Sequence, residues 1–515
     1  MKQIIPTTQY KKDLKRYANQ RKKMEALLEI LRCLANEEPI PENCRPHLLT
    51  GQYKGCMECH IGGDFLLIWI EDDIISLIRL GSHSELFGQK KRFLSSKRSD
   101  QMRTTIYIIL AIVLSSCAST RAVKHGNPTL DDYKIFEQDR VGNSERHFTF
   151  KELSTNTRFL DTLKLDMYFA KSNSFQQMTI GESMEYIGKP SAAIIIKNDT
   201  ILYEHYHGGW NKESQSTVFS ITKTITSLLC GVALKEGYIR SVTDKVTDYI
   251  PELKKEDSMF EKLTIEHLLD MTAGLKFDES YNWNPFSQMA KLHYGKNTLK
   301  TIRNMKFANT PGERYHYNSM TTAILGIVIE RATGIPYAEY LSEKVWKPLG
   351  MEQSASISLD SKKHRIAKSY GGLTTNVRDL AKIGRLYLNK GNWNGVQIID
   401  TAFVERSHTK KYIGSNNGTY SYNWYWGTTD HRYFKDKESL RQYYKAFPSM
   451  KIATTMRSNK TGDYAAIFHR GGFWAEGLYG QVLYVNTEKN YIAVFLGADR
   501  IEDYCYVFDR LYEIL

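Results

Sequence analysis

The chain has 515 residues, of which 42% are hydrophobic and 12% aromatic, and its formal charge is +13. This length is too great for one hydrophobic core, and this composition excludes a disordered or fibrous protein. Residues 1–88 are neutral overall, residues 89–103 contribute +5, and the remaining +8 is spread over residues 104–515. This spread charge is weak evidence for nucleic-acid binding and fits a solvated basic surface at least as well, and the seven cysteines are too few for a disulfide framework.

Residues 1–88 predict a small α+β domain. Residues 8–35 carry apolar side chains at helical spacing, and they are followed by three strand-like runs, "HLLTGQYKGCMECHI", "DFLLIWIEDD" and "IISLIRLGSH". We expect a helical pair followed by a small antiparallel sheet. The string "CMECH" also fits the attachment motif of c-type haem, but that chemistry needs export and we expect no export signal here, so no cofactor is predicted.

This first segment resembles the RelE/YafQ-type toxins of bacterial toxin–antitoxin pairs. The matching stretches are "YKKDLKR", "PHLLTGQYKG", "ECHIGGDFLLIW" and "LIRLGSHSELF". The resemblance implies a cytoplasmic, ribosome-dependent mRNA endonuclease whose partners are the ribosome, mRNA and an antitoxin protein. It also implies six active-site positions, namely His47, His60, Asp64, Arg79, His83 and Phe87.

The chemistry of these residue types suits RNA cleavage. Histidine titrates near neutral pH and can move the protons of the 2′-hydroxyl and of the leaving oxygen. Arginine can hold the phosphate, and phenylalanine can stack on a base. The alternative is that the histidines of this segment are ordinary polar surface.

Residues 89–117 predict a connection and an export signal. Residues 89–101 are basic and predict a linker or read-through segment, whereas residues 102–117 have the pattern of a lipoprotein-type signal. The apolar run from Ile106 to Leu114 is too short to cross a bilayer, which needs about 20 residues. The tetrad "LSSC" resembles the lipobox of bacterial lipoproteins, which implies a lipid anchor on Cys117 in the cell envelope.

A signal segment inside a chain suggests that two reading frames have been joined. We therefore expect Met102 to be a natural start, although a short buried helix is the alternative for this segment. Residues 118–179 then form a tether and an N-terminal extension, and residues 180–515 form the main domain.

The main domain predicts an α/β arrangement. Asn198-Asp199 separates two apolar runs, and Glu488-Lys489-Asn490 separates two more, so each pair predicts a hairpin. The stretch from Met320 to Arg331 is apolar at helical spacing and ends at Gly334. We expect an antiparallel sheet built from both ends of the domain, with flanking helices and a helical subdomain, so the whole chain is α/β and multidomain.

The stretch "VFSITKTITSLLCG" places Ser220 three residues before Lys223 at the start of an apolar helix. Serine is a common helix N-cap, so this tetrad alone does not identify a nucleophile. A second Ser-x-x-Lys begins at Ser407, where the surroundings predict a surface segment.

Three motifs together resemble the serine β-lactamase and penicillin-binding-protein superfamily over about residues 180–512. The resemblance is greatest to class C β-lactamase-like esterases and 6-aminohexanoate-dimer hydrolases. Ser220 and Lys223 match the first motif, Tyr317-Asn318-Ser319 matches the second imperfectly, and only Gly477 in "AEGLYGQ" matches the third. The resemblance implies an acyl-enzyme on the serine and an oxyanion hole made by the N–H groups of Ser220 and Leu478.

The roles of the remaining residues follow from their chemistry. A lysine removed from water has a lowered pKa and can accept the serine proton. Tyr317 is the candidate general base, because a phenol beside an ammonium ionises more easily. Ser319 and Gly477 are the candidate substrate-binding positions.

Two departures from the family pattern bear on the substrate. Ser319 stands where the family has asparagine, and Ala475 stands where it has lysine. We therefore expect small-molecule ester or linear amide substrates rather than β-lactams. The aromatic residues of "SYNWNPF", "YSYNWYWG" and "GGFWAEG" are candidates for the acyl pocket or for the core.

Two other functions stay open at this point. In the first alternative, the chain acts as an mRNA-cleaving toxin and its second half is a passenger domain. In the second alternative, the second half is a binding module that keeps the fold but has lost turnover. No metal cluster and no phosphate-binding glycine loop stands out in the sequence.

Overall fold

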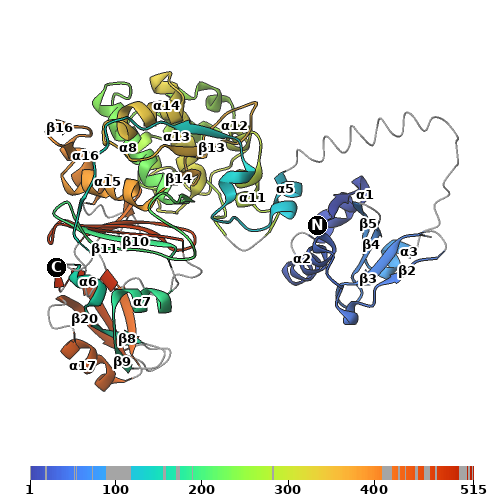
Figure 1. Cartoon of the computed structure of the whole chain (residues 1–515). Helices are drawn as coiled ribbons and strands as arrows, with labels where there is room; N and C mark the ends of the chain where they lie inside the picture. Colours follow the sequence, from blue (N-terminus) through green and yellow to red (C-terminus); the bar gives the residue numbers. More distant parts are fainter. Residues whose placement is uncertain are drawn as a thin grey trace. The chain divides into compact units, whose positions relative to one another are not determined.

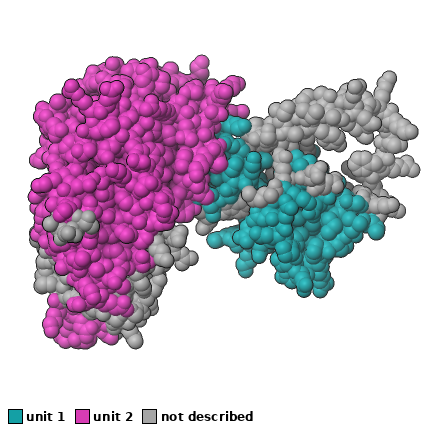
Figure 2. Space-filling model, viewed as in Figure 1, with its two compact units in different colours: residues 1–128, 280–296 teal, residues 129–279, 297–515 magenta. Residues whose placement is uncertain are grey.

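The structure, a computed structural model, has two compact units, residues 1–128 with 280–296 and residues 129–279 with 297–515 (Figures 1 and 2). It describes residues 2–17, 20–50, 53, 55–71, 74–87, 118–154, 158–169, 174–187, 190–280, 284–408, 420–426, 430–434, 436–446, 451–457, 464–469, 472–497, 507–508, 511–512 and 514–515. The predicted linker, the signal segment and Cys117 lie outside these ranges, so they and the predicted domain boundaries stay predictions. In the described ranges, no helix is both long and apolar enough to cross a membrane.

The first unit holds a five-stranded sheet with the order β1-β5-β4-β3-β2. Its elements are β1 (Gln3–Pro6), α1 (Thr8–Tyr17), α2 (Arg21–Asn36), β2 (His47–Leu48), β3 (Met57–His60), β4 (Leu66–Glu71), β5 (Ile74–Gly81) and α3 (His83–Phe87). The two helices and the sheet share one apolar core that includes Leu27, Leu67 and Trp69. The helical pair is confirmed, with the break between its helices at about residue 20.

One strand of this sheet was not predicted. β1 pairs parallel with β5, Gln3 opposite Ile74, so the expectation of a purely antiparallel sheet is wrong. The physical reason is that β1 is only four residues long and pairs with residues about 70 positions away, which leaves no local hairpin pattern. The unit also includes α5 (Ala118–His125) and α11 (Gln288–Tyr294), joined by a hydrogen bond from the Arg121 guanidinium to the Tyr294 carbonyl oxygen.

The second unit is built on an eight-stranded sheet with the order β17-β18-β22-β23-β24-β10-β11-β7. Its strands are β7 (Lys151–Glu152), β10 (Ala192–Lys197), β11 (Thr200–Tyr206), β17 (Tyr420–Ser421), β18 (Trp424–Trp426), β22 (Phe473–Gly477), β23 (Gln481–Asn486) and β24 (Tyr491–Leu496). β10 pairs with β24, so both ends of the domain meet in one sheet as predicted. The sheet is antiparallel except where the short β7 joins β11 in parallel.

Both predicted hairpins are present in this sheet. Asn198 and Asp199 turn with φ of 49° and 58°, a left-handed conformation that these two residue types tolerate. The second turn, at residues 487–490, connects β23 to β24.

Helices cover both faces of the sheet (Figure 1). On one face lie α8 (Ile221–Lys235) and α15 (Val377–Leu388), and α15 approaches so closely that a Cβ at Gly384 would lie 2.8 Å from the Ile492 side chain. On the other face, α6 (Phe159–Thr162), α7 (Ile180–Ile187) and residues near the C-terminus share an apolar cluster with inward-facing sheet residues.

A helical layer packs on α8. Its elements are α9 (Val246–Tyr249), η5 (Pro251–Lys255), η6 (Ser258–Lys262), α10 (Ile265–Leu269), α12 (Thr298–Arg303), α13 (Ser319–Thr333), α14 (Tyr337–Leu341), η7 (Ser342–Trp346) and α16 (Thr401–Ser407). α13 ends at Gly334 with φ of 69°, which confirms the predicted cap.

The remaining elements are short or peripheral. They are η1 (Glu42–Cys44), η3 (Asp132–Ile135), α17 (Lys437–Ala446), and the strands of four smaller sheets, β6 (Gln138–Val141), β12 (Ser216–Thr217), β13 (Ala355–Ser358) and β14 (Leu373–Thr375), β8 (Leu165–Phe169) and β9 (Ser174–Met178), β15 (Asn392–Trp393) and β16 (Val396–Gln397), and β19 (Asp430–Phe434), β20 (Lys451–Arg457) and β21 (Tyr464–His469).

Candidate functional site

Ser220 lies immediately before the first residue of α8. Every residue of this helix from Ile221 to Ala233 is buried, because all of them except Lys223 are apolar or small and the helix packs between the sheet and the helical layer. Phe219, one residue earlier, has φ of 45°, an uncommon and costly conformation for a residue with a large side chain. The local backbone is therefore held in a strained turn at the residue that precedes the serine.

Lys223 lies one helical turn after Ser220, and the two side chains meet. The Lys223 Nζ donates to Ser220 Oγ at 2.9 Å and to the carbonyl oxygen of Tyr370 at 2.8 Å. The lysine is only 1% exposed, and burial lowers its pKa to about 8, against the opposing effect of the Glu279 carboxylate. A sizeable fraction of this amine is neutral near pH 8 and can accept a proton.

Tyr317 is brought to the same place from the segment before α13. The Lys223 Nζ lies 5.1 Å from the centroid of the Tyr317 ring. The ring also contacts Tyr420 and Tyr425, with centroid separations of 5.8 Å and 6.4 Å. The structure thus brings together the serine, the lysine and the tyrosine that the sequence singled out.

Gly477 ends β22 against the backbone that leads to Ser220. A Cβ at this position would lie 2.4 Å from the carbonyl oxygen of Val218, so only glycine allows this approach. Within the part of the chain that the structure describes, neither the Ser220 N–H nor the Leu478 N–H donates to a protein acceptor. Both predicted oxyanion-hole donors are therefore available on neighbouring backbone segments.

Ser319 lies at the first position of α13, where an unpredicted residue binds it. Its hydroxyl donates to Glu279 Oε1 at 2.5 Å, and its N–H donates to Glu279 Oε2 at 2.8 Å. Asn318 caps the same helix by accepting from the Met320 N–H at 2.9 Å. The Glu279 carboxylate therefore fixes the segment that carries Tyr317 and also contributes negative charge near Lys223.

Sequence reasoning missed Glu279 because nothing in the string "FDES" sets it apart. It lies 40 positions before the helix whose first turn it binds. One signal for such a residue exists in the sequence. The first N–H groups of a helix need hydrogen-bond acceptors, and Asn318 can accept from only some of them, so a further acceptor from elsewhere in the chain is expected.

The aromatic segments divide between the site and the core by strand alternation. Tyr425 stacks on Trp474 at 5.8 Å, on the same side as Tyr317, whereas the preceding residue, Trp424, packs on Phe473 at 4.9 Å in the core. Of the three predicted segments, "YSYNWYWG" and "GGFWAEG" supply side chains to both places.

The second Ser-x-x-Lys does not lie on the surface as expected. Ser407 is fully buried at the end of α16, and its hydroxyl donates to the Phe403 carbonyl oxygen at 2.9 Å. Ser407 lies on the buried face of this helix with Phe403 and Val404, and as the last residue of the helix it has no helix N-terminus beside it.

In the first unit, four of the six candidate residues come together. The Asp64 carboxylate accepts from the His83 N–H at 2.8 Å, and the His83 ring lies 4.8 Å from the Phe87 ring and 6.5 Å from the His60 ring. Arg79 contacts Tyr53, which in turn lies against Phe87. His47 is exposed, with Nδ1 at 3.1 Å from the Arg45 carbonyl oxygen.

Asp13 is a further residue of this unit that the sequence did not reveal. It is 1% exposed, and its Oδ2 accepts from Arg79 Nε at 2.6 Å and from the Leu80 N–H at 3.3 Å. Its other oxygen accepts from Arg16 at 2.8 Å. This carboxylate sets the orientation of the Arg79 side chain.

Metal binding has no support among the described residues, which contain no group of three His, Cys, Asp or Glu side chains placed to hold an ion.

The comparisons with known proteins match two segments of the chain. Residues 179–504 match the family model of the Beta-lactamase family, and residues 2–88 match YafQ, a bacterial toxin of type II toxin-antitoxin systems. A 6-aminohexanoate-dimer hydrolase of Paenarthrobacter ureafaciens is 28% identical over 226 residues, which is 42% of this chain and 56% of that protein. Protein flp of Staphylococcus aureus (strain COL) is 27% identical over 176 residues, 32% of this chain and 34% of that protein.

The chain therefore spans about half, or less, of the curated relatives that it matches. A solved structure from Bacillus anthracis, provisionally assigned as a 6-aminohexanoate-dimer hydrolase, superposes with a TM-score of 0.57 at 21% identity and covers 74% of this chain and 90% of that one. This likeness is one of fold.

Proposed function

Since the chain belongs to the Beta-lactamase family, we propose that it is a serine hydrolase that cleaves ester or amide substrates through an acyl-enzyme on Ser220. The observation that carries the proposal is the direct hydrogen bond between Lys223 Nζ and Ser220 Oγ, on a lysine with 1% exposure. A buried lysine is costly to a fold, so its position beside a hydroxyl at a helix start argues for chemistry.

The first half of the reaction would form the acyl-enzyme. Neutral Lys223, alone or with the Tyr317 phenol, takes the proton of Ser220 while Oγ bonds to the substrate carbonyl carbon. The N–H groups of Ser220 and Leu478 donate to the carbonyl oxygen as it becomes negative. The carbon–oxygen or carbon–nitrogen bond then breaks, and the proton passes to the leaving alcohol or amine.

The second half would release the acid. Water adds to the acyl carbon and gives a proton to the same base, after which the bond to Ser220 Oγ breaks and the serine is protonated again. Tyr317 is the candidate that moves this proton, because its ring lies 5.1 Å from the lysine ammonium.

The substrate class follows from the charge of β22. Ala475 stands where a carboxylate-binding lysine would be required for β-lactams, and the next residue, Glu476, is acidic and accepts from Trp474 Nε1 at 2.6 Å. We expect esters and linear amides to be cleaved and nitrocefin to be a poor substrate.

The experiment compares the chain with its Ser220→Ala and Lys223→Met variants on p-nitrophenyl esters, short linear amides and nitrocefin. Both variants are expected to lose at least about a hundredfold in kcat/KM on the good substrates. Ser407→Ala is the matched control, because it changes the second tetrad and should leave turnover unaltered. Wild-type turnover in Ser220→Ala would refute the proposal, and rapid nitrocefin cleavage would refute the substrate class.

A second candidate function belongs to the first unit. The proximity of His60, His83 and Phe87 beside Asp64, together with the match to YafQ, supports an mRNA endonuclease acting with the ribosome and an antitoxin. Translation arrest on expression of the chain, lost in His83→Ala, is the expected result. We further propose export of the second unit with a lipid on Cys117, which radiolabelled palmitate incorporation in the wild type and its loss in Cys117→Ala would test.

A further inference from the structure

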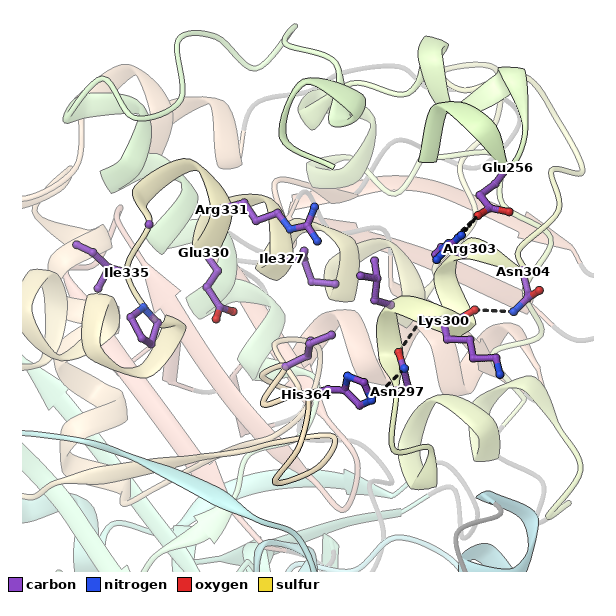
Figure 3. A pocket seen from close by; sticks show the side chains of 14 residues that line it. Glu256, Asn297, Lys300, Arg303, Asn304, Ile327, Glu330, Arg331, Ile335 and His364 are labelled. Carbon is purple, nitrogen blue, oxygen red and sulfur yellow. Dashed lines mark hydrogen bonds and ion pairs between the residues drawn. The ribbon is translucent and has the colours of Figure 1, made fainter. Parts of the chain in front are cut away.

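A surface cavity of about 860 Å³ lies in the second unit, between α12, α13 and the segment around His364 (Figure 3). Its wall includes Glu330 and Arg331 from the last turns of α13. Glu330 follows Ser319 by eleven residues, so it lies about 16 Å along the helix from the end that adjoins Tyr317. The cavity is therefore separate from the site around Ser220.

Most of the charge on the cavity wall is already neutralised. The two terminal nitrogens of Arg331 bind the carboxylate of Glu252 at 2.8 and 2.7 Å. Arg303 Nε binds Glu256 at 2.6 Å. In the described part of the chain, no ion pair within 4.0 Å engages Glu330 or the exposed Lys300, so one negative and one positive side chain of the wall remain unmatched.

Glu330 is partly buried, and among the described residues no basic side chain forms an ion pair with it within 4.0 Å. Burial, with smaller contributions from Asp139 and Asp360, raises the pKa of its carboxyl to about 7, although Arg331 and Arg365 oppose the change. A cation in contact with this carboxylate would restore the missing stabilisation of its ionised form.

The surface next to these charges is aliphatic. Leu299, Ile327, Ile335 and Ile366 line the cavity, and in the view of Figure 3 Ile327 lies between Glu330 and Lys300. A chain of methylene groups lying on this surface would remove apolar area from water.

From this arrangement we infer that the cavity binds a small aliphatic zwitterion, with its ammonium group on Glu330, its carboxylate toward Lys300 and its methylene chain on the isoleucine side chains. An alkylamine would satisfy only the first contact, and an alkanoate only the second. Only a compound with an amino group at one end and a carboxylate at the other makes both contacts.

Calorimetry on the full chain carrying Ser220→Ala tests this inference without turnover at the serine. The ligands are a series of ω-amino acids from four to eight carbons, with the alkylamine and the alkanoate of equal length beside each. We expect one chain length to bind best, and to bind more tightly than either singly charged analogue.

Two variants assign the contacts. Glu330→Gln, which keeps the shape of the side chain, should weaken binding of the zwitterion and of the amine by about tenfold or more, as the loss of a charge-assisted hydrogen bond predicts. Lys300→Ala should weaken the zwitterion a few-fold and leave the amine unaffected, because an exposed ion pair contributes little. Glu261→Gln, an exposed glutamate outside the cavity, is the matched control. Equal binding in Glu330→Gln and this control, or no binding by any member of the series, would overturn the inference.

Discussion

The replacement Lys223→Met tests the role of the buried lysine, whose lowered pKa of about 8 sets the size of the expected effect. Methionine has a similar length and no charge, so the variant keeps the packing of α8 and removes only the amine. This amine is expected to lose its proton near pH 8, because burial disfavours the ammonium by more than the Glu279 carboxylate favours it.

The size of the effect follows from the lowered pKa. A change from 10.5 to about 8 corresponds to about 3 kcal/mol in favour of the neutral amine in the folded chain. Because the folded pKa is depressed, the unfolded chain binds the proton more tightly between these values, and the folded chain gains stability as pH rises through them. The free energy of unfolding of the wild type, relative to that of Lys223→Met, should therefore rise by up to about 3 kcal/mol between pH 7 and pH 10.5.

Two measurements check this. Urea denaturation of both proteins at a series of pH values gives the difference in stability, and the other titrating groups cancel between them. Acylation rates on a p-nitrophenyl ester should rise about tenfold per pH unit below pH 8 and level off above it in the wild type, and should be lower by at least about a hundredfold in the variant. Two results would refute the assignment of a neutral Lys223. One is a stability difference that does not depend on pH, and the other is an acylation rate that keeps rising until about pH 10.

Three further predictions concern other parts of the chain. Gly477→Ala places a Cβ 2.4 Å from the Val218 carbonyl oxygen, so kcat/KM on esters should fall by roughly a hundredfold or more as the oxyanion donor shifts. Glu330→Gln removes a carboxyl whose pKa is raised from 4.5 to about 7 in the folded chain, so ionisation of this group costs stability as pH rises through these values. Urea denaturation should show that the wild type, relative to this variant, loses up to about 3 kcal/mol of its free energy of unfolding between pH 4 and pH 8. Asp13→Asn removes the negative charge that Arg79 Nε contacts at 2.6 Å, so translation arrest by the chain should weaken and its first unit should lose about 3 kcal/mol of stability in hydrogen exchange. Unchanged ester turnover in Gly477→Ala would contradict the first prediction. A stability difference between the wild type and Glu330→Gln that does not depend on pH would contradict the second, and full translation arrest by Asp13→Asn would contradict the third.

Much of the fold could be predicted because its signals are local. The turn at Asn198-Asp199 and the helix that ends at Gly334 follow from residue types within a few positions, and the structure confirms both. The resemblance to two families was likewise predictable from short strings and is confirmed by the matches over residues 179–504 and 2–88.

What could not be predicted depends on contacts between distant segments. The parallel pairing of β1 with β5 joins residues about 70 positions apart, and no periodicity reveals it. Glu279 binds the start of α13 across 40 positions, and the Tyr370 carbonyl oxygen that accepts a hydrogen bond from Lys223 Nζ lies 147 positions away from that lysine. The buried position of Ser407 is a further case, because the buried face of a short helix cannot be recognised from seven residues.

The central claim is that Ser220 becomes acylated. Intact-mass spectrometry of the full chain after brief exposure to a slowly hydrolysed aryl ester, followed by peptide mapping, measures this directly. We predict one acyl group per chain, located on Ser220, absent in Ser220→Ala and slow to form in Lys223→Met. Turnover of the ester without an adduct on this serine, or an adduct that persists in Ser220→Ala, would contradict the account.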